Sequence, residues 1–166
     1  LYEVVKLLNE DAGYDFIYSD EDKLSEDGTK RRNPFFKPDW SPDTFMSLMY
    51  TCHLSVYRKT LLEELGGLRV GLEGSQDYDL VLRVMEKTKR IGHIPKILYH
   101  WREREESTAN AISAKPYIIE ATRKAKLDAL ERRGAKGHLE YLPDIILMPN
   151  VGSRALMWQE TAGVKN

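Results

Sequence analysis

Residues 73–83 read EGSQDYDLVLR, a glycine-containing loop that runs into a helix. Ser75 is expected to cap this helix, because its hydroxyl can accept a hydrogen bond from an amide of the first turn. Asp77 and Asp79 fall in the first turn, where the helix dipole favours negative charge. Leu80 begins an apolar stripe that would seat the helix in a core. A helix that begins in this way can present the Asp77 carboxylate to a cleft; the alternative is that Asp77 only stabilises the helix start.

The composition is that of a soluble globular domain. Of the 166 residues, 42% are hydrophobic and 31% charged, a length and balance that predict a single domain with a core. The net charge of −1 argues against a nucleic-acid binder that relies on bulk electrostatics. Cys52 is the only cysteine, which excludes an intrachain disulfide and a cysteine-based zinc site. No apolar run is long enough to cross a bilayer, and no signal peptide is recognised.

Three carboxylates follow a predicted strand near the start of the chain. Residues 15–19 are rich in strand-forming side chains, and Asp20, Glu21 and Asp22 come directly after them. We expect these three residues to lie in a loop. Carboxylates in that position could ligate a hard cation through oxygen, or they could simply be solvated.

A basic cluster and an aromatic loop come next. Residues 30–32 read KRR and are expected to be a solvated loop, with contact to phosphate or lipid head groups as the alternative. Residues 33–40 contain two prolines and three aromatic residues, which predict an extended loop. The Trp40 ring could stack on the face of a sugar, or it could pin the loop over a core.

The middle of the chain predicts a helix, a strand and a second helix. The first helix starts at residues 41–43, with a proline in its first turn. Residues 51–57 alternate well enough to predict a strand that includes His53. Residues 58–65 predict a short helix that a pair of glycines ends.

A histidine and an arginine lie close together after the helix that carries Asp77. Residues 91–102 predict two short strands or one bent strand. His100 and Arg102 are two residues apart, so they lie on the same side of a regular strand. A neutral imidazole can ligate a divalent metal, and a guanidinium can bind a diphosphate. The alternative for His100 is strand packing.

The C-terminal part of the chain is less informative. Residues 103–112 are polar and could form a lid over a ligand. Residues 113–133 predict an amphipathic helix whose inner face includes Tyr117. Residues 138–150 predict a strand pair interrupted by Pro143, and the tail after them is weakly patterned.

Four separated motifs together resemble the second half of a family 2 glycosyltransferase of the GT-A fold, of the bacterial type that builds cell-surface polysaccharides and O-antigens. The resemblance covers residues 1 to about 133. It implies an α/β fold: the acceptor-side half of a GT-A fold, with helices packed on a small mixed sheet. Residues 1–137 would be the C-terminal portion of that domain, and residues 138–166 a C-terminal extension. The four motifs are YSDEDK (residues 18–23), FKPDWS (36–41), EGSQDYDLVLR (73–83) and HIPKILYHWR (93–102).

The resemblance also implies a reaction and a role for each candidate residue. The family transfers a sugar from a nucleotide-diphosphate donor to an acceptor hydroxyl with inversion, which needs a base on the acceptor oxygen and a cation on the leaving diphosphate. Asp77 would be the base. His100 and Arg102 would hold the diphosphate, with His100 also a metal ligand. The residues that would line the cleft near donor and acceptor are Asp20, Glu21, Asp22, Trp40, Glu73 and Gln76, the last standing where the family often has glutamate.

The expected cofactor is Mg²⁺ or Mn²⁺. In the family, the aspartate pair that holds the metal precedes a helix like residues 1–10, so we expect that pair before Leu1 in a longer protein, and we expect this fragment alone to be inactive. The expected partners are a nucleotide sugar donor and a glycan or lipid-linked glycan acceptor. A sheet edge left open by the missing half would favour a homodimer. The expected location is the cytoplasm, peripheral to the inner face of the membrane.

Two other classes compete with this interpretation. A non-catalytic domain that binds a glycan or a protein could carry similar aromatic and acidic loops. A nucleotidyltransferase would share the sheet architecture, but it needs a glycine-rich phosphate loop, and these residues contain none.

Overall fold

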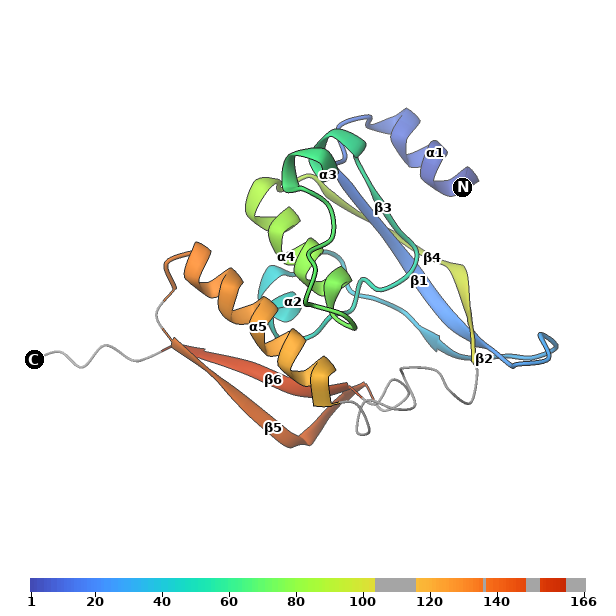
Figure 1. Cartoon of the computed structure of the whole chain (residues 1–166). Coiled ribbons are helices and arrows are strands. Elements are labelled where there is room, and N and C mark those ends of the chain that lie inside the picture. The colour runs from blue at the N-terminus through green and yellow to red at the C-terminus, as the bar shows by residue number, and fades with distance from the viewer. Residues whose placement is uncertain (104–115, 136, 149–152, 161–166) are drawn as a thin grey trace, which may run out of the picture. The chain divides into compact units, whose positions relative to one another are not determined.

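The computed structural model describes residues 1–103, 116–135, 137–148 and 153–160, and these residues fold into two compact units (Figure 1). Each unit is assembled from separated segments of the chain, because the chain passes from one unit to the other several times. Among the described residues, unit 1 takes those within Leu1–Ser41, Tyr50–Gly67 and Lys87–Ser107, and unit 2 takes those within Pro42–Met49, Leu68–Glu86 and Thr108–Asn166.

A mixed four-stranded sheet forms the centre of unit 1 (Figure 1). Its central strand is β1 (Phe16–Leu24), which pairs in parallel with β4 (Ile91–Arg102) along its whole length. The other edge of β1 is shared by two antiparallel partners. β3 (Ser55–Tyr57) pairs with the first part of β1, and β2 (Arg31–Phe35) pairs with the last part. Because β1 has neighbours on both edges, its backbone is fully engaged in the sheet.

Two helices complete unit 1. α1 (Tyr2–Glu10) places Val4 in a buried apolar cluster with Ile17 of β1 and Ile94 of β4. α3 (Lys59–Leu65) follows β3 and ends at Gly66, whose φ of 73° is in the left-handed region that glycine adopts without strain.

In its described residues, unit 2 combines three helices with a two-stranded antiparallel ribbon. The fully buried Phe45 packs edge-to-face on Tyr78, with ring centroids 5.1 Å apart. The Tyr78 hydroxyl also donates a hydrogen bond to the Phe45 carbonyl at 2.6 Å, which ties two distant segments together. In Figure 1 the two longer helices run side by side. The elements are α2 (Pro42–Ser47), α4 (Gln76–Lys87, of which Lys87 belongs to unit 1), α5 (Pro116–Arg132), β5 (Gly137–Met148) and β6 (Ser153–Glu160).

The mixed α/β class expected from the sequence is confirmed, and so are several elements. α2, α3 and α4 occur where the caps and periodicity predict them. Of the two alternatives for residues 91–102, one strand with irregular register is observed. Within the described residues, no helix is both long enough and apolar enough to span a bilayer.

Other expectations about secondary structure were wrong. His53 lies outside β3, which starts at Ser55. The described residues 138–148 do not form a strand pair of their own. They lie in the single strand β5, which has a shift in register between Leu142 and Ile146, and the partner of β5 is β6 in the weakly patterned tail. Tyr117, expected on the inner face of α5, is 54% exposed.

Most of the segment 103–112, the expected lid, lies outside the described residues.

Candidate functional site

The three carboxylates of residues 20–22 lie within β1, which corrects the expectation of a loop. Each is 2% to 3% exposed. Asp and Glu are unfavourable in strands, which is why the sequence predicts a loop after residue 19. The strand continues because tertiary partners satisfy each carboxylate in turn, and a buried charge needs such partners.

Asp20 holds a histidine in place. Its Oδ1 accepts a hydrogen bond from the Lys37 amide at 2.9 Å and lies 2.9 Å from His93 Nε2. The other ring nitrogen, Nδ1, lies 2.9 Å from Oδ1 of the exposed Asp39. The imidazole also stacks on Tyr18, with centroids 4.7 Å apart. His93 is therefore fixed on three sides, and a neutral imidazole could donate to only one of its two carboxylates.

Glu21 is paired with a buried lysine. The Lys37 ammonium, with a fully buried side chain, donates to Glu21 Oε2 at 3.0 Å and to the carbonyls of Thr51 at 2.7 Å and His53 at 2.5 Å. Glu21 Oε2 also accepts from the His53 amide at 3.0 Å. The three protons of the ammonium thus have three acceptors. This arrangement pins the two loops that carry Lys37 and His53 onto β1.

Asp22 orients His100. Its Oδ1 lies 2.5 Å from His100 Nδ1, and its Oδ2 accepts from Arg31 Nε at 2.6 Å. Burial opposes ionisation of Asp22, but the hydrogen bonds from His100 and Arg31 hold its pKa below the usual value. The His100 side chain is 40% exposed. A carboxylate on one ring nitrogen is the arrangement that fixes the orientation of a metal-ligating or acid–base histidine.

The other predicted residues of unit 1 make contacts of their own. The Trp40 ring lies edge-on to Tyr18 at 6.5 Å and tilted against Tyr50 at 6.2 Å, and stacking of this ring on a sugar stays a prediction. The exposed Arg102 donates from Nη1 to the Glu26 carbonyl at 3.0 Å. His100 and Arg102 thus contact different groups of the β1–β2 hairpin.

The basic cluster of residues 30–32 is not a free loop. Arg31 and Arg32 begin β2, where Arg31 pairs with Asp22 and Arg32 forms an ion pair with Glu103. The predicted extended loop of residues 33–40 is correspondingly shorter, because β2 runs to Phe35.

The start of α4 presents Asp77 to solvent. Asp77 is exposed, and its Oδ1 accepts a hydrogen bond from the Tyr78 amide at 2.8 Å. The preceding turn is held by two further side chains. Glu73 Oε1 accepts from the Gly71 amide at 2.9 Å, and Gln76 Oε1 accepts from the Gly74 amide at 2.6 Å.

Ser75 connects this turn to α5. Its hydroxyl lies 2.5 Å from the Thr122 hydroxyl and 3.5 Å from the Ile118 carbonyl. The sequence predicts Ser75 as a helix cap, whereas the contacts of its hydroxyl are with α5. Gly74 has a φ of 87°, and a Cβ there would lie 2.8 Å from the Ile118 side chain, so glycine is required by both conformation and space.

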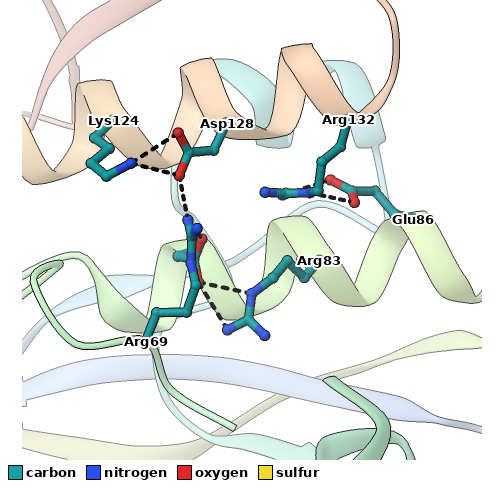
Figure 2. Close-up of polar contacts among 7 residues, drawn as sticks. Arg69, Arg83, Glu86, Lys124, Asp128 and Arg132 are labelled. Atoms are coloured by element: carbon teal, nitrogen blue, oxygen red, sulfur yellow. Dashed lines mark hydrogen bonds and ion pairs between the residues drawn. The ribbon is translucent and has the colours of Figure 1, made fainter. Parts of the chain in front are cut away.

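Asp79 is buried within an ion-pair network that includes Arg69, Arg83 and Asp128, which are labelled in Figure 2. Its carboxylate is fully buried and pairs with Arg69 at 2.5 Å and with Arg83 at 2.8 Å. Arg69 also donates to Asp128 of α5 at 2.8 Å, so one guanidinium joins the loop before α4 to both helices. Figure 2 shows a second link between the same helices, in which Arg132 pairs with Glu86 at 2.8 Å.

A buried lysine of α5 gives a prediction for pH dependence. Lys126 is 1% exposed and donates to the Ser47 carbonyl at 3.0 Å, and burial lowers its pKa to about 7. The unfolded chain, with the ordinary lysine pKa, therefore holds more protons than the folded chain above pH 7, so the free energy of unfolding should rise with pH from about 7 to 10. The slope from this group approaches about 1.4 kcal/mol per pH unit. Urea unfolding at several pH values, with Lys126→Met, measures it.

Lys126→Met should remove this slope, whereas Lys124→Met, with a 60% exposed side chain on the same helix, should keep it. Parallel pH profiles for the parent and Lys126→Met would show that the ammonium stays charged in the folded state.

The candidate residues thus form two groups, one in each unit. Unit 1 brings Asp20, Glu21, Asp22 and His100 onto β1 and β4, and unit 2 holds Glu73, Gln76 and Asp77 around the start of α4. The sequence alone does not single out His93 and Lys37. Neither stands in a spacing pattern that indicates a partner, since their carboxylates lie 73 and 16 positions away.

Metal binding stays a prediction. The described residues contain no group of three or more His, Cys, Asp or Glu side chains that could hold a metal ion. His100 fits as a single ligand, because its Nδ1 faces Asp22 and its ring is partly exposed.

Comparison with known proteins adds two relatives. No family model matches the chain. The chain is 40% identical over 157 residues to an uncharacterized protein, y4gI, of Sinorhizobium fredii, an alignment that covers 93% of this chain and 17% of that protein. It is 43% identical over 118 residues to the O-antigen biosynthesis protein RfbC of Myxococcus xanthus, which covers 71% of this chain and 9% of that protein. The chain therefore spans less than a fifth of either relative, and what it is similar to is a small part of an O-antigen biosynthesis protein.

Proposed function

We propose that the chain is part of an inverting glycosyltransferase that acts in the synthesis of a cell-surface polysaccharide. It would transfer a sugar from a nucleotide-diphosphate sugar to an acceptor hydroxyl of a glycan or lipid-linked glycan, at the cytoplasmic face of the membrane. The similarity to an O-antigen biosynthesis protein over 71% of the chain supports the process, and the resemblance of four motifs to family 2 glycosyltransferases supports the reaction.

The observation that carries the proposal is the contrast between the two aspartates at the start of α4. Asp79 is fully buried between two arginines, whereas Asp77 is exposed. The ion pairs thus give Asp79 a structural role, whereas the exposed Asp77 is accessible to a substrate. A carboxylate fixed at the start of a helix is well suited to accept a proton from a bound hydroxyl.

In this proposal, Asp77 takes the proton of the acceptor hydroxyl as the acceptor oxygen attacks the anomeric carbon. The bond between that carbon and the diphosphate oxygen breaks on the opposite face, so the configuration inverts and the nucleoside diphosphate leaves with the bonding electrons. A divalent cation, when bound, would neutralise the charge of the leaving diphosphate. His100 would supply one of its ligands, together with the aspartate pair expected before Leu1.

Donor hydrolysis tests the proposal. UDP-sugars and dTDP-sugars are mixed with the chain, and with the longer gene product where one is encoded, in the presence of Mg²⁺ or Mn²⁺. We expect the longer gene product to release the nucleoside diphosphate from at least one donor in a metal-dependent way, and the chain alone to release none. Absence of release from every donor by the folded longer product would count against the reaction.

The second candidate is a non-catalytic domain that binds a glycan or a protein. It is favoured by the pairing of Asp20, Glu21 and Asp22, because each of these carboxylates is already satisfied by groups of the same chain. Such a domain would bind a saccharide or a partner without any release of nucleotide.

The contact between Asp22 and His100 gives a further prediction. Asp22→Asn should raise the Mg²⁺ or Mn²⁺ concentration for half-maximal activity by about 10- to 100-fold, because a carboxylate hydrogen-bonded to a metal-ligating histidine fixes the orientation and basicity of that histidine. His100→Ala should raise it at least as much. A metal titration of each variant measures the effect, with Lys96→Met, an exposed change on the same strand, as control. An unchanged titration for His100→Ala would remove it from the metal shell.

A further inference from the structure

The face of β1 opposite Asp20 and Asp22 carries a second cluster of polar and aromatic side chains. Successive side chains of a strand point to opposite faces, so Glu21 and Lys23 share this other face. In the sheet, Lys23 pairs with Trp101 of β4 on one side and with Arg32 of β2 on the other.

Among the described residues, Lys23 is a buried cation without a hydrogen-bond acceptor. It is 5% exposed, and its ammonium lies 3.4 Å from the centroid of the Trp101 ring. Within the described part of the chain, no oxygen accepts a hydrogen bond from the Lys23 ammonium, and the Trp101 ring is its close partner. Burial lowers its pKa, because water is removed from an ammonium that gains no acceptor in exchange.

His53 adds a second unsatisfied group beside the same tryptophan. Its ring stacks on Tyr99 at 4.6 Å and lies 5.4 Å from the Trp101 ring. Its Nδ1 is buried, and in the described residues it has no hydrogen-bond partner. The facing oxygen, Glu21 Oε2, is 3.9 Å away and already accepts two hydrogen bonds. Buried polar groups are nearly always paired, so two unpaired groups in one cluster indicate a missing ligand.

The charges of this face favour an anion as that ligand. Arg32 is paired with Glu103, and Lys37 is paired with Glu21. Lys23 has no carboxylate within ion-pair distance in the part of the chain that the structure describes. One positive charge is therefore uncompensated, and it lies against the half-buried Trp101 ring.

We propose that Lys23, Trp101 and His53 bind an oxyanion carried by a sugar substrate, either a phosphate or a carboxylate. The ammonium would donate charge-assisted hydrogen bonds to the oxyanion, and His53 would supply a second donor in the tautomer with its proton on Nδ1. The rings of Trp101 and Tyr99 would offer apolar surface to the attached group. The sugar part of this ligand rests on the proposed function. The oxyanion part rests on the contacts of Lys23 and His53.

Tryptophan fluorescence can follow binding, because the Lys23 ammonium contacts the Trp101 ring. The chain is titrated with inorganic phosphate, pyrophosphate and glucuronate, and with glucose and chloride as controls, all at one ionic strength. We expect a saturable change with the phosphates or with glucuronate, which distinguishes the two sources of the oxyanion. Trp101→Phe should remove the signal. Lys23→Met should weaken binding by about tenfold or more, as expected for the loss of a hydrogen bond to a charged group.

The matched control is Lys59→Met, which removes a lysine whose side chain is 88% exposed and should leave binding unchanged. Equal binding by the parent and Lys23→Met, or an equal response to chloride, would overturn the proposal. If Lys23→Met does not fold, the parent decides the question: the ¹⁵N resonance of the Lys23 ammonium must shift with the oxyanion and not with glucose. These measurements need no sugar transfer, so their failure leaves the proposed glycosyltransferase reaction standing, and loss of transfer alone leaves the oxyanion site standing.

Discussion

Asp77→Asn is expected to lower the rate of sugar transfer by about 10²–10⁴-fold, the usual loss when a general base is removed. The fold should be unaffected, because the carboxamide oxygen of asparagine can still accept the hydrogen bond that Asp77 Oδ1 receives from the Tyr78 amide. The measurement is single-donor turnover in the gene product that contains this chain, with circular dichroism and thermal unfolding as tests of the fold.

Asp43→Asn is the control for this experiment. Asp43 is also an exposed aspartate in the first turn of a helix, α2, but it lies outside the candidate site. Its replacement should leave transfer within about twofold, since an exposed first-turn carboxylate contributes only to local helix stability. Near-normal turnover by Asp77→Asn would mean that Asp77 serves the helix start alone, and the base would then have to be sought elsewhere.

The second large effect is on stability. Asp79→Ala should lower the free energy of unfolding by about 3–5 kcal/mol, because the variant loses a fully buried carboxylate that is paired with two arginines. The arginine left behind is Arg83, whose side chain is only 9% exposed, while Arg69 would keep its contact with Asp128. Urea denaturation of the parent and the variant measures the difference.

Glu63→Ala provides a matched comparison on α3. Glu63 pairs with Lys59 at the same four-residue helical spacing that separates Asp79 from Arg83, but both members of the Glu63–Lys59 pair are largely exposed. Exposed pairs of this kind contribute about 0.3–0.5 kcal/mol. If Asp79→Ala lowers the free energy of unfolding by less than about 1 kcal/mol, Arg83 must find another acceptor or reach solvent. The contrast between a structural Asp79 and an accessible Asp77 would then have no basis.

The sequence predicts α4 well because every local signal agrees. Glycine, serine and the first-turn aspartates all mark the helix start, and the apolar stripe follows at helical spacing. The same signals do not separate Asp77 from Asp79, since both suit a first turn. The difference between them arises from Arg69 and Arg83, and the contact with Arg69 comes from a preceding loop whose path no local pattern encodes.

The acidic residues of β1 show the opposite case. Local preference favours a loop at Asp20, Glu21 and Asp22, and the long-range partners His93, Lys37 and His100 reverse that preference. β6 was missed for a similar reason, because its pairing with β5 is a property of two segments together and leaves little trace in either alone. In unit 1 the secondary structure depends on long-range pairing between residues, and the local sequence does not show which residues pair.

The parallel pairing of β1 with β4 has a consequence for how the chain folds during synthesis. Asp22 and His100 are 78 positions apart, and the intervening segment contributes to both units. Contacts of such long sequence separation slow folding, because the loop must close before any pairing can stabilise it. The ribosome adds about 5–20 residues per second. Until it has made β4, the acidic strand β1 has no parallel neighbour. A protein truncated before residue 91 should therefore depend on chaperones, and a fast-translating host should give more aggregate than a slow one.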